Sequence, residues 1–269
     1  MKTSSLDLLA CPRCKGKLSL LGRNGSVPTG SLSCPSCALE YPIEDGMPHF
    51  VRAEDLTGPN QRFAHLYDLF SHFYALYSRV AFAFLGGESR NRREVLDRLQ
   101  PRQGRLLEIS IGPGVNLPYL REIPGLTEIY GLDISLGQLR RCQSLSRRKG
   151  WDVELFLGNA EELPFRDEAF DVVFHIGGIN FFNDKAKAMA EMIRVARPGT
   201  NIVIVDENEK GARSYELTLP GFRRSFKSKR EPIRPPVDLV PAGMLDVRLS
   251  DVWRGWFYCL EFRKPGERE

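Results

Sequence analysis

Between residues 104 and 207, short apolar runs alternate with longer amphipathic segments, and this order constrains the fold more than any other feature. Strands are expected to begin near Leu106, Thr127, Val153, Phe170 and Asn201. The segments "LGQLRRCQSLSRRKG" and "DKAKAMAEMIRVAR" predict helices between them, the second burying a face of Ala186, Met189, Ile193 and Ala196. Such alternation predicts a parallel sheet with helices on both faces, where ligands bind beyond the carboxyl ends of the strands.

The stretch "LLEISIGPGVN", Leu106 to Asn116, ends the first strand in a glycine turn. Gly112 and Gly114 let a ligand approach the backbone closely, and Glu108 is a single acid within the apolar run. The G-x-G-x-x-G turn that binds a pyrophosphate is incomplete, because Leu117 replaces its third glycine. Pro118 also removes a backbone N–H donor. The turn is therefore expected to bind something other than a pyrophosphate.

Two further strand ends carry polar residues. Asp133, 25 residues after Glu108 and followed by Ile134, is placed where an acid can accept both hydroxyls of a ribose. Asn159 and Ala160 suit an adenine edge, with the amide facing the exocyclic amine and a backbone N–H facing a ring nitrogen. The alternative is that Asp133 only favours a helix N-terminus and Asn159 only forms a turn. An adenosyl group with a non-phosphate tail fits all three strand ends.

Cys11-Pro-Arg-Cys14 and Cys34-Pro-Ser-Cys37 are two C-x-x-C pairs separated by 19 residues. Each pair offers two thiolates on one turn, and zinc takes four such ligands at tetrahedral angles. Without a recognisable secretion signal, metal binding is favoured over disulfides. The pairs predict a structural Zn²⁺ site with two short strands between them, whereas Cys142 and Cys259 are expected to be buried, inert thiols.

An aromatic-rich segment connects the cysteine module to the rest of the chain. After "RAEDLTGPN", aromatic residues recur at three- and four-residue spacing from Phe63 to Tyr77, which is typical of a helix. Most are interpreted as core contacts, and the alternative is a lid in which Tyr67 faces the cofactor. The predicted organisation is a zinc ribbon at 1–54, a connecting or lid helix at 55–90, and a catalytic domain at 91–269.

Composition excludes little. Hydrophobic residues make up 42% and charged residues 27%, which is ordinary for a soluble globular protein. The net charge of +4 permits contact with nucleic acid without arguing for it. No leader is recognised, and no apolar run approaches the roughly 20 residues that cross a bilayer. A cytoplasmic protein without a membrane span is expected.

Four stretches in order resemble the motifs of the class I S-adenosylmethionine-dependent methyltransferases: "LLEISIGPGVN", "YGLDIS", "GNAEELPFRDEAFDVVF" and "EMIRVARPGTNIVIVDE". The resemblance spans about residues 104–207 and implies a Rossmann-like, seven-stranded, mostly parallel sheet with S-adenosyl-L-methionine as cofactor. It implies that Gly112 and Gly114 border the methionine portion and that Asp133 binds the ribose. It also implies that Asn159 and Ala160 contact the adenine, and that Glu108 orients the loop or the amino group. Ser110 departs from this pattern where a glycine is common, and Asn159 where an aspartate is common.

The cysteine module resembles a second family. "LLACPRCKGKL", "LSCPSC" and "YPIEDGMPHF" look like small zinc-ribbon proteins that bind and activate methyltransferases of RNA and protein. The resemblance covers about residues 5–52. In that family the ribbon is usually a separate subunit, so its fusion here implies that no separate activator subunit is needed. The ribbon remains open to two interpretations, a recognition module or a folding cap.

The segment "HIGGINFFND", His175 to Asp184, lies where the methyl acceptor is expected. His175 is the candidate general base because imidazole titrates near neutrality, and a buried strand-end histidine is the alternative. Phe181 and Phe182 are expected to wall an apolar acceptor.

The catalytic portion most resembles the ubiquinone and menaquinone biosynthesis type, which implies a small, apolar or aromatic acceptor. One alternative is an RNA base methyltransferase that uses the ribbon and the basic clusters at 140–149 and 223–234. The other is a non-catalytic scaffold that only binds S-adenosylmethionine.

Overall fold

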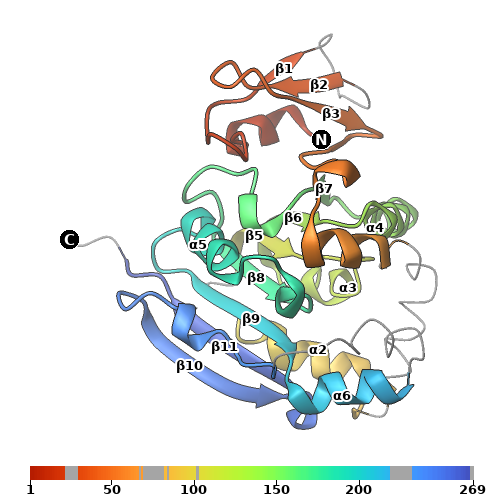
Figure 1. The fold of residues 1–269 in the computed structure, drawn as a ribbon, viewed down its shortest axis with the longest axis vertical. Helices are drawn as coiled ribbons and strands as arrows, with labels where there is room; N and C mark the ends of the chain where they lie inside the picture. Colours follow the sequence, from red (N-terminus) through yellow and green to blue (C-terminus); the bar gives the residue numbers. More distant parts are fainter. Residues whose placement is uncertain are drawn as a thin grey trace.

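The fold contains two sheets, shown in Figure 1. The computed structural model describes residues 1–21, 30–66, 68, 82–83, 85–100, 103–218 and 232–266. The N-terminal sheet is an antiparallel ribbon in the order β1 (Ser19–Leu21), β2 (Gly30–Ser33), β3 (Glu40–Glu44) and β4 (Met47–Pro48). The central sheet has seven strands in the order β10-β11-β9-β8-β5-β6-β7.

Five neighbouring strands of the central sheet are parallel, and a C-terminal hairpin completes it. The parallel strands are β5 (Gln103–Ile109), β6 (Gly125–Asp133), β7 (Glu154–Leu157), β8 (Val172–Ile176) and β9 (Asn201–Glu207). The antiparallel hairpin is β10 (Leu245–Val252) and β11 (Phe257–Arg263). The predicted seven-stranded, mostly parallel sheet is confirmed. Because the chain runs from β5 to β6 and β7 and then returns to β8, the strand order reverses between β5 and β8, where such folds bind ligands.

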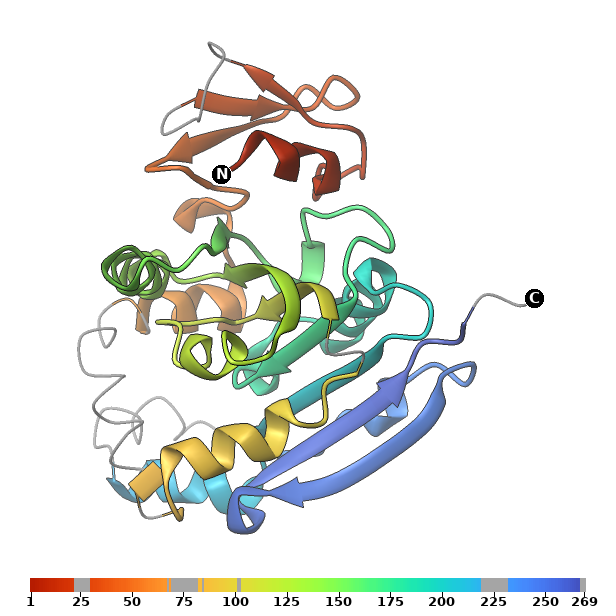
Figure 2. The same ribbon diagram turned by 180° about the vertical axis from the view of Figure 1, so that it is seen from behind.

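Helices cover both faces of the sheet (Figure 2). They are α2 (Glu88–Leu96), α3 (Leu117–Leu120), α4 (Leu136–Lys149), α5 (Lys185–Val195) and α6 (Glu209–Thr218). Short 3₁₀ turns are η1 (Thr3–Leu8), η2 (Ala53–Asp55), η3 (Ala160–Glu162), η4 (Ile179–Phe181), η5 (Val237–Leu239) and η6 (Trp253–Gly255). One core joins α2, α3 and α4 to the sheet, and the other joins α5 and the ribbon to its opposite face. The predicted domain boundary at residue 90 falls within α2.

Helix α5 buries a face that matches the predicted one only in part, because Met189 and Ala196 are buried as predicted. Ala186 is exposed and Ile193 is only partly buried. The fully buried apolar residues of the helix are Ala188, Met189, Met192 and Val195. The error has a physical cause, because apolar residues fill more than one row of this helix. Contact with the sheet selects the row that is buried.

Helix α4 begins directly after β6. The Ser135 hydroxyl accepts a hydrogen bond from the backbone N–H of Gln138 and so caps the first turn. Gly150 ends the helix with φ +63°, a conformation that glycine adopts without steric cost. The cap places the first residue of α4, Leu136, three residues beyond Asp133.

The ribbon is joined to the central sheet by backbone pairing along the edge strand β7. His49 forms a parallel bridge with Leu157, and the Phe50 N–H donates to the Leu157 carbonyl at 2.7 Å. A second pairing joins Leu9 to Phe165 in an antiparallel bridge. Figures 1 and 2 show the ribbon at the opposite end of the molecule from β10 and β11. The ribbon thus covers an edge strand that would otherwise expose unpaired backbone groups.

Aromatic side chains continue the core from the ribbon into the sheet. Ring centroids of Tyr41 and Phe50 lie 5.0 Å apart, and those of Phe50 and Phe156 lie 6.5 Å apart. Phe156 in turn packs edge-on against Phe165, 5.2 Å away. Because these residues belong to one buried cluster, the stability of the ribbon and that of the sheet are expected to be coupled.

Candidate functional site

The structure brings the predicted strand-end residues to one edge of the sheet. Ile109 of β5 lies opposite Leu132 of β6 on one side and His175 of β8 on the other. Asp133 at the end of β6 pairs with Leu157 at the end of β7. The glycine turn, Asp133, Asn159 and the segment after β8 therefore surround the place where the strand order reverses.

Asp133 is nearly buried, and both of its carboxylate oxygens accept backbone hydrogen bonds. The Gly112 N–H donates to Oδ2 at 2.8 Å, and the Ser135 N–H donates to Oδ1 at 2.9 Å. Burial raises the pKa of Asp133 to about 6, against the effect of these N–H groups. Each oxygen retains a further lone pair, so the carboxylate can still accept two neighbouring hydroxyls. Ile134, the next residue, is partly exposed.

Glu108 is buried below the same turn, with 1% of its surface exposed. Its Oε1 accepts a hydrogen bond from Asn116 Nδ2 at 2.6 Å, and Arg92 Nη1 donates to Asn116 Oδ1 at 2.8 Å. Its Oε2 is buried and has no hydrogen-bond partner within the described part of the chain. Burial raises the pKa of Glu108 to about 8. A buried acceptor without a partner is unusual and fits a donor group supplied by a ligand.

The two glycines of the turn have different surroundings. Gly112 has φ +56°, and a Cβ added there would meet no atom within 4 Å. Gly114 has φ +79°, and a Cβ there would lie 2.7 Å from Leu117 Cδ1 and 2.8 Å from Cys142 Sγ. Gly112, whose N–H contacts Asp133, thus borders open space, whereas Gly114 permits close packing beneath the turn.

Glu108→Gln is expected to change the pH dependence of stability in the ligand-free protein. The folded state holds the Glu108 proton between pH 4.5 and about 8, where the unfolded chain releases it. This residue therefore stabilises the fold at low pH, and its contribution is lost as the pH rises through that window. The Tm of wild type relative to Glu108→Gln should fall from pH 5 to pH 8 in thermal melts. A constant difference between the two would contradict the burial of an ionisable proton at this position.

Asn159 caps the short turn η3. Its Oδ1 accepts the Glu161 N–H at 3.0 Å, and Ala160 behind it is 5% exposed. The turn role considered from the sequence is therefore present. One lone pair of Oδ1 remains for a ligand amine, so the adenine contact stays a prediction.

The connecting segment contacts three of the segments around this edge. Residues 58–66 are helical. Asn60 Nδ2 donates to Glu161 Oε1 of η3 at 2.9 Å, and Phe63 stacks on Phe181 of η4 with ring centroids 3.9 Å apart. Asp68 accepts the Gly137 N–H in the first turn of α4 at 2.8 Å. Tyr67 lies outside the described residues. Sequence reasoning missed Asn60 and Asp68, since polar residues in an aromatic helix are usually exposed to solvent.

His175 is fully buried, and both of its ring nitrogens are engaged by the backbone. Nδ1 lies 3.2 Å from the Ile109 carbonyl, to which it donates, and Nε2 accepts the Ile179 N–H at 3.0 Å. Burial lowers the pKa of His175 to about 4. This geometry leaves no free nitrogen lone pair to remove a proton. It therefore favours the alternative of a structural strand-end histidine over a general base.

Asp206 and Asn180 hold the loop after β8 and were not singled out from the sequence. Asp206 is fully buried at the end of β9, and its Oδ2 accepts the Asn180 N–H at 2.8 Å. Asn180 Nδ2 donates to the Glu207 carbonyl at 2.8 Å. The rule applied to the other strands, that polar residues at a strand end face a ligand edge, would have pointed to Asp206.

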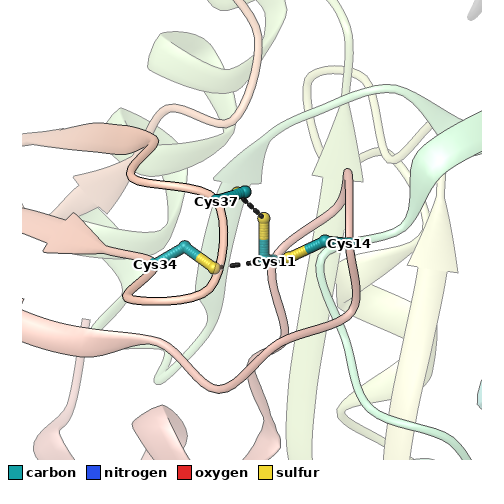
Figure 3. Close-up of side chains that lie close together, drawn as sticks. All are labelled: Cys11, Cys14, Cys34 and Cys37. Atoms are coloured by element: carbon teal, nitrogen blue, oxygen red, sulfur yellow. Dashed lines mark hydrogen bonds between the residues drawn. The ribbon is translucent and has the colours of Figure 1, made fainter.

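The four ribbon cysteines form a compact group, shown in Figure 3. Their sulfur atoms all lie within 4.8 Å of one another, with 3.6 Å between Cys11 and Cys37 and 3.4 Å between Cys14 and Cys34. Tetrahedral zinc with sulfur ligands at about 2.3 Å separates the sulfurs by about 3.8 Å, so the group fits this ion. The Tyr41 hydroxyl lies 3.2 Å from Cys11 Sγ, where it can orient a thiolate. Separately, Cys142 and Cys259 are buried, as predicted.

An ion-pair cluster joins the first cysteine pair to the loop after η3. Lys15 Nζ lies 2.7 Å from Glu191 Oε2 on α5 and donates to the Leu163 carbonyl at 3.3 Å. Arg194 contacts the same Glu191 carboxylate at 2.7 Å. The Ala10 N–H also donates to the Pro164 carbonyl at 3.1 Å. The cysteine module is therefore in direct contact with the chain that follows Asn159 and Ala160.

Few features of the described residues bear on a membrane or an RNA partner. Across the described ranges, no helix has the length and apolar character needed to cross a bilayer. Within the basic cluster of α4, Gln143 and Arg147 donate to the Asp45 carbonyl of the ribbon. Residues 219–231, which include most of the second basic cluster, lie outside the described residues.

Two regions of the chain match known protein families. Residues 107–204 match the family described as methyltransferase domain, and residues 3–46 match the Trm112p-like protein family. A demethylmenaquinone methyltransferase of Renibacterium salmoninarum is 36% identical over 124 residues, covering 45% of this chain and 49% of that protein. A phosphatidylethanolamine N-methyltransferase of Cereibacter sphaeroides is 29% identical over 185 residues, covering 64% of this chain and 89% of that protein. The chain thus spans about half the length of the first of these relatives.

A solved structure shows a similar fold. It is a complex between the Haloferax volcanii Trm112 methyltransferase activator and a putative methyltransferase. The TM-score is 0.54 at 15% identity, and the match covers 74% of this chain and 97% of that chain. Together with the sheet order and the cysteine group, these matches show a class I S-adenosylmethionine-dependent methyltransferase domain preceded by a Trm112p-like domain with four clustered cysteines.

Proposed function

We propose that the protein transfers the methyl group of S-adenosylmethionine to a small, apolar or aromatic acceptor. The observation that supports this most strongly is the open space beside Gly112 and Asp133, together with the buried, unpartnered Oε2 of Glu108 at the end of the neighbouring β5. A cationic amino group and a ribose are the ligand parts that such carboxylates bind. Two relatives are named for demethylmenaquinone and phosphatidylethanolamine, which favours an apolar acceptor over RNA.

In this proposal each strand end binds one part of the cofactor. Asp133 accepts the ribose hydroxyls, Asn159 and the Ala160 backbone contact the adenine, and Ile134 packs beside it. Glu108 Oε2 accepts the amino group, and a cation there favours the ionised carboxylate, so cofactor binding releases the Glu108 proton. The cofactor supplies an electrophilic methyl group on a sulfonium. The main contribution of the chain is orientation, which can lower a barrier by about 7–11 kcal/mol.

The connecting segment serves as the lid in this proposal, with Tyr67 as a further candidate contact to the cofactor. Its contacts with η3, η4 and α4 support this. These three elements lie at the proposed adenine, acceptor and ribose positions, respectively. Phe63 and Phe181 then form one apolar wall of the acceptor site. An acceptor that is already nucleophilic at neutral pH fits best, since His175 has no free nitrogen.

We further propose that Cys11, Cys14, Cys34 and Cys37 hold a structural Zn²⁺. Four thiolates complete its coordination, so no position remains for a substrate. The ribbon then stabilises the catalytic sheet from within the same chain and makes a separate activator subunit unnecessary.

The proposal is tested by incubating the purified chain with methyl-labelled S-adenosylmethionine and a cell extract. The extract is then separated into RNA, protein and organic-soluble pools. Label is expected in the organic-soluble pool. Label in RNA would overturn the acceptor class and favour the ribbon as a recognition module. Cofactor binding without label in any pool would instead support a non-catalytic scaffold.

A further inference from the structure

Ser110, the first residue after β5, has a backbone conformation that glycine normally occupies. Its φ is +60°, in the left-handed region, where a side chain with a Cβ is strained. Glycine would adopt this conformation without cost, and the same turn contains glycine at 112 and 114. The strain arises from the Cβ atom of the serine. A serine at this position is therefore expected to make a contact that compensates for the strain.

The Ser110 side chain points toward the end of β8. Ser110 Oγ is the atom nearest to a Cβ built on Gly178, at 3.7 Å, and the next are His175 Cε1 and Phe182 Cε1, both at 3.9 Å. A Cβ on the neighbouring Gly177 would meet no atom within 4 Å. The hydroxyl therefore projects between the ends of β5 and β8, where the strand order reverses and side chains leave room.

Hydrogen bonds within the described part of the chain do not compensate for the strain. Among the residues that the structure describes, none forms a hydrogen bond with Ser110 Oγ. Ser110 is also partly exposed. The hydroxyl is thus available to a ligand at the point where the strand order reverses.

We propose that Ser110 is a positioning residue whose hydroxyl donates a hydrogen bond to the carboxylate of the methionine portion of S-adenosylmethionine. This rests on the proposed function. Glu108 attracts the amino group and repels the carboxylate, which leaves the carboxylate on the Ser110 side of the turn. Such a contact fixes the direction of the sulfonium relative to the acceptor loop at Gly177 and Gly178.

The test compares Ser110→Ala with Ser110→Gly in the full chain, using calorimetric affinities and thermal melts. Ser110→Ala keeps the strain and removes the hydroxyl, whereas Ser110→Gly removes both. Both variants should bind S-adenosylmethionine about tenfold more weakly, the loss of one hydrogen bond to a charged group. Only Ser110→Gly should raise the Tm. Glu168→Gly, at an exposed position with φ +55°, is the matched control and should leave cofactor affinity unchanged.

5′-Methylthioadenosine, which lacks the amino-acid portion, separates the proposed contact from a general disturbance of the site. Its affinity should be the same for wild type and Ser110→Ala. An equal loss for both ligands, or unchanged S-adenosylmethionine affinity in Ser110→Ala, would overturn the proposed contact alone. A wild-type chain that fails to bind S-adenosylmethionine would overturn the proposed function together with it.

Discussion

Cys34→Ser is expected to lower the Tm by roughly 10 °C or more, because loss of a structural metal costs several kcal/mol and each kcal/mol shifts the Tm of a chain this size by about 2–4 °C. The effect should extend beyond the ribbon. Cys11 and Cys34 belong to the buried cluster that contains Phe156 and Phe165 of the catalytic portion. Differential scanning calorimetry and measurement of bound zinc test the prediction directly.

The same substitution should weaken S-adenosylmethionine binding about tenfold or more. Lys15 and Ala10 of the ribbon contact the carbonyls of Leu163 and Pro164, directly after η3. Arg13→Ala, at an exposed position between Cys11 and Cys14, is the control and should leave zinc content and affinity unchanged. A zinc-free Cys34→Ser protein that melts and binds cofactor like wild type would contradict the proposal that the ribbon stabilises the catalytic sheet.

Asp133→Asn is expected to reduce S-adenosylmethionine affinity about 100-fold or more. The substitution removes a carboxylate that would accept two ribose hydroxyls, and hydrogen bonds to a charged group contribute about 1.5–3 kcal/mol each. The asparagine amide would also turn an N–H donor toward the N–H of either Gly112 or Ser135. Isothermal titration calorimetry with the full chain gives the affinity, and methyl-transfer activity should be lost in parallel.

Asp238→Asn provides the matched control for Asp133→Asn. It removes the same charge from an exposed position in η5 and should leave cofactor affinity unchanged. A circular dichroism melt distinguishes loss of binding from loss of fold. If folded Asp133→Asn binds S-adenosylmethionine within threefold of wild type, the ribose assignment is wrong.

Most of the candidate site follows from local sequence, because strand ends in a parallel sheet meet at one edge. Glu108, Gly112, Asp133 and Asn159 each lie at such an end, and the register of β5, β6 and β7 brings them together. The environment of His175 could not be read in this way. Its pKa and role depend on the Ile109 carbonyl and the Ile179 N–H, which reach it only when β5, β8 and η4 are assembled.

The amino-acid sequence by itself determined the alternation of strands and helices, the two cysteine pairs and the glycine turn. These depend on periodicity, residue chemistry and backbone freedom within a few neighbouring residues. Only the tertiary structure decided which face α5 buries, how the ribbon pairs with β7, and that Asn60 and Asp68 contact the loops around the site. Each of these is a choice between locally equivalent surfaces, and long-range packing makes that choice.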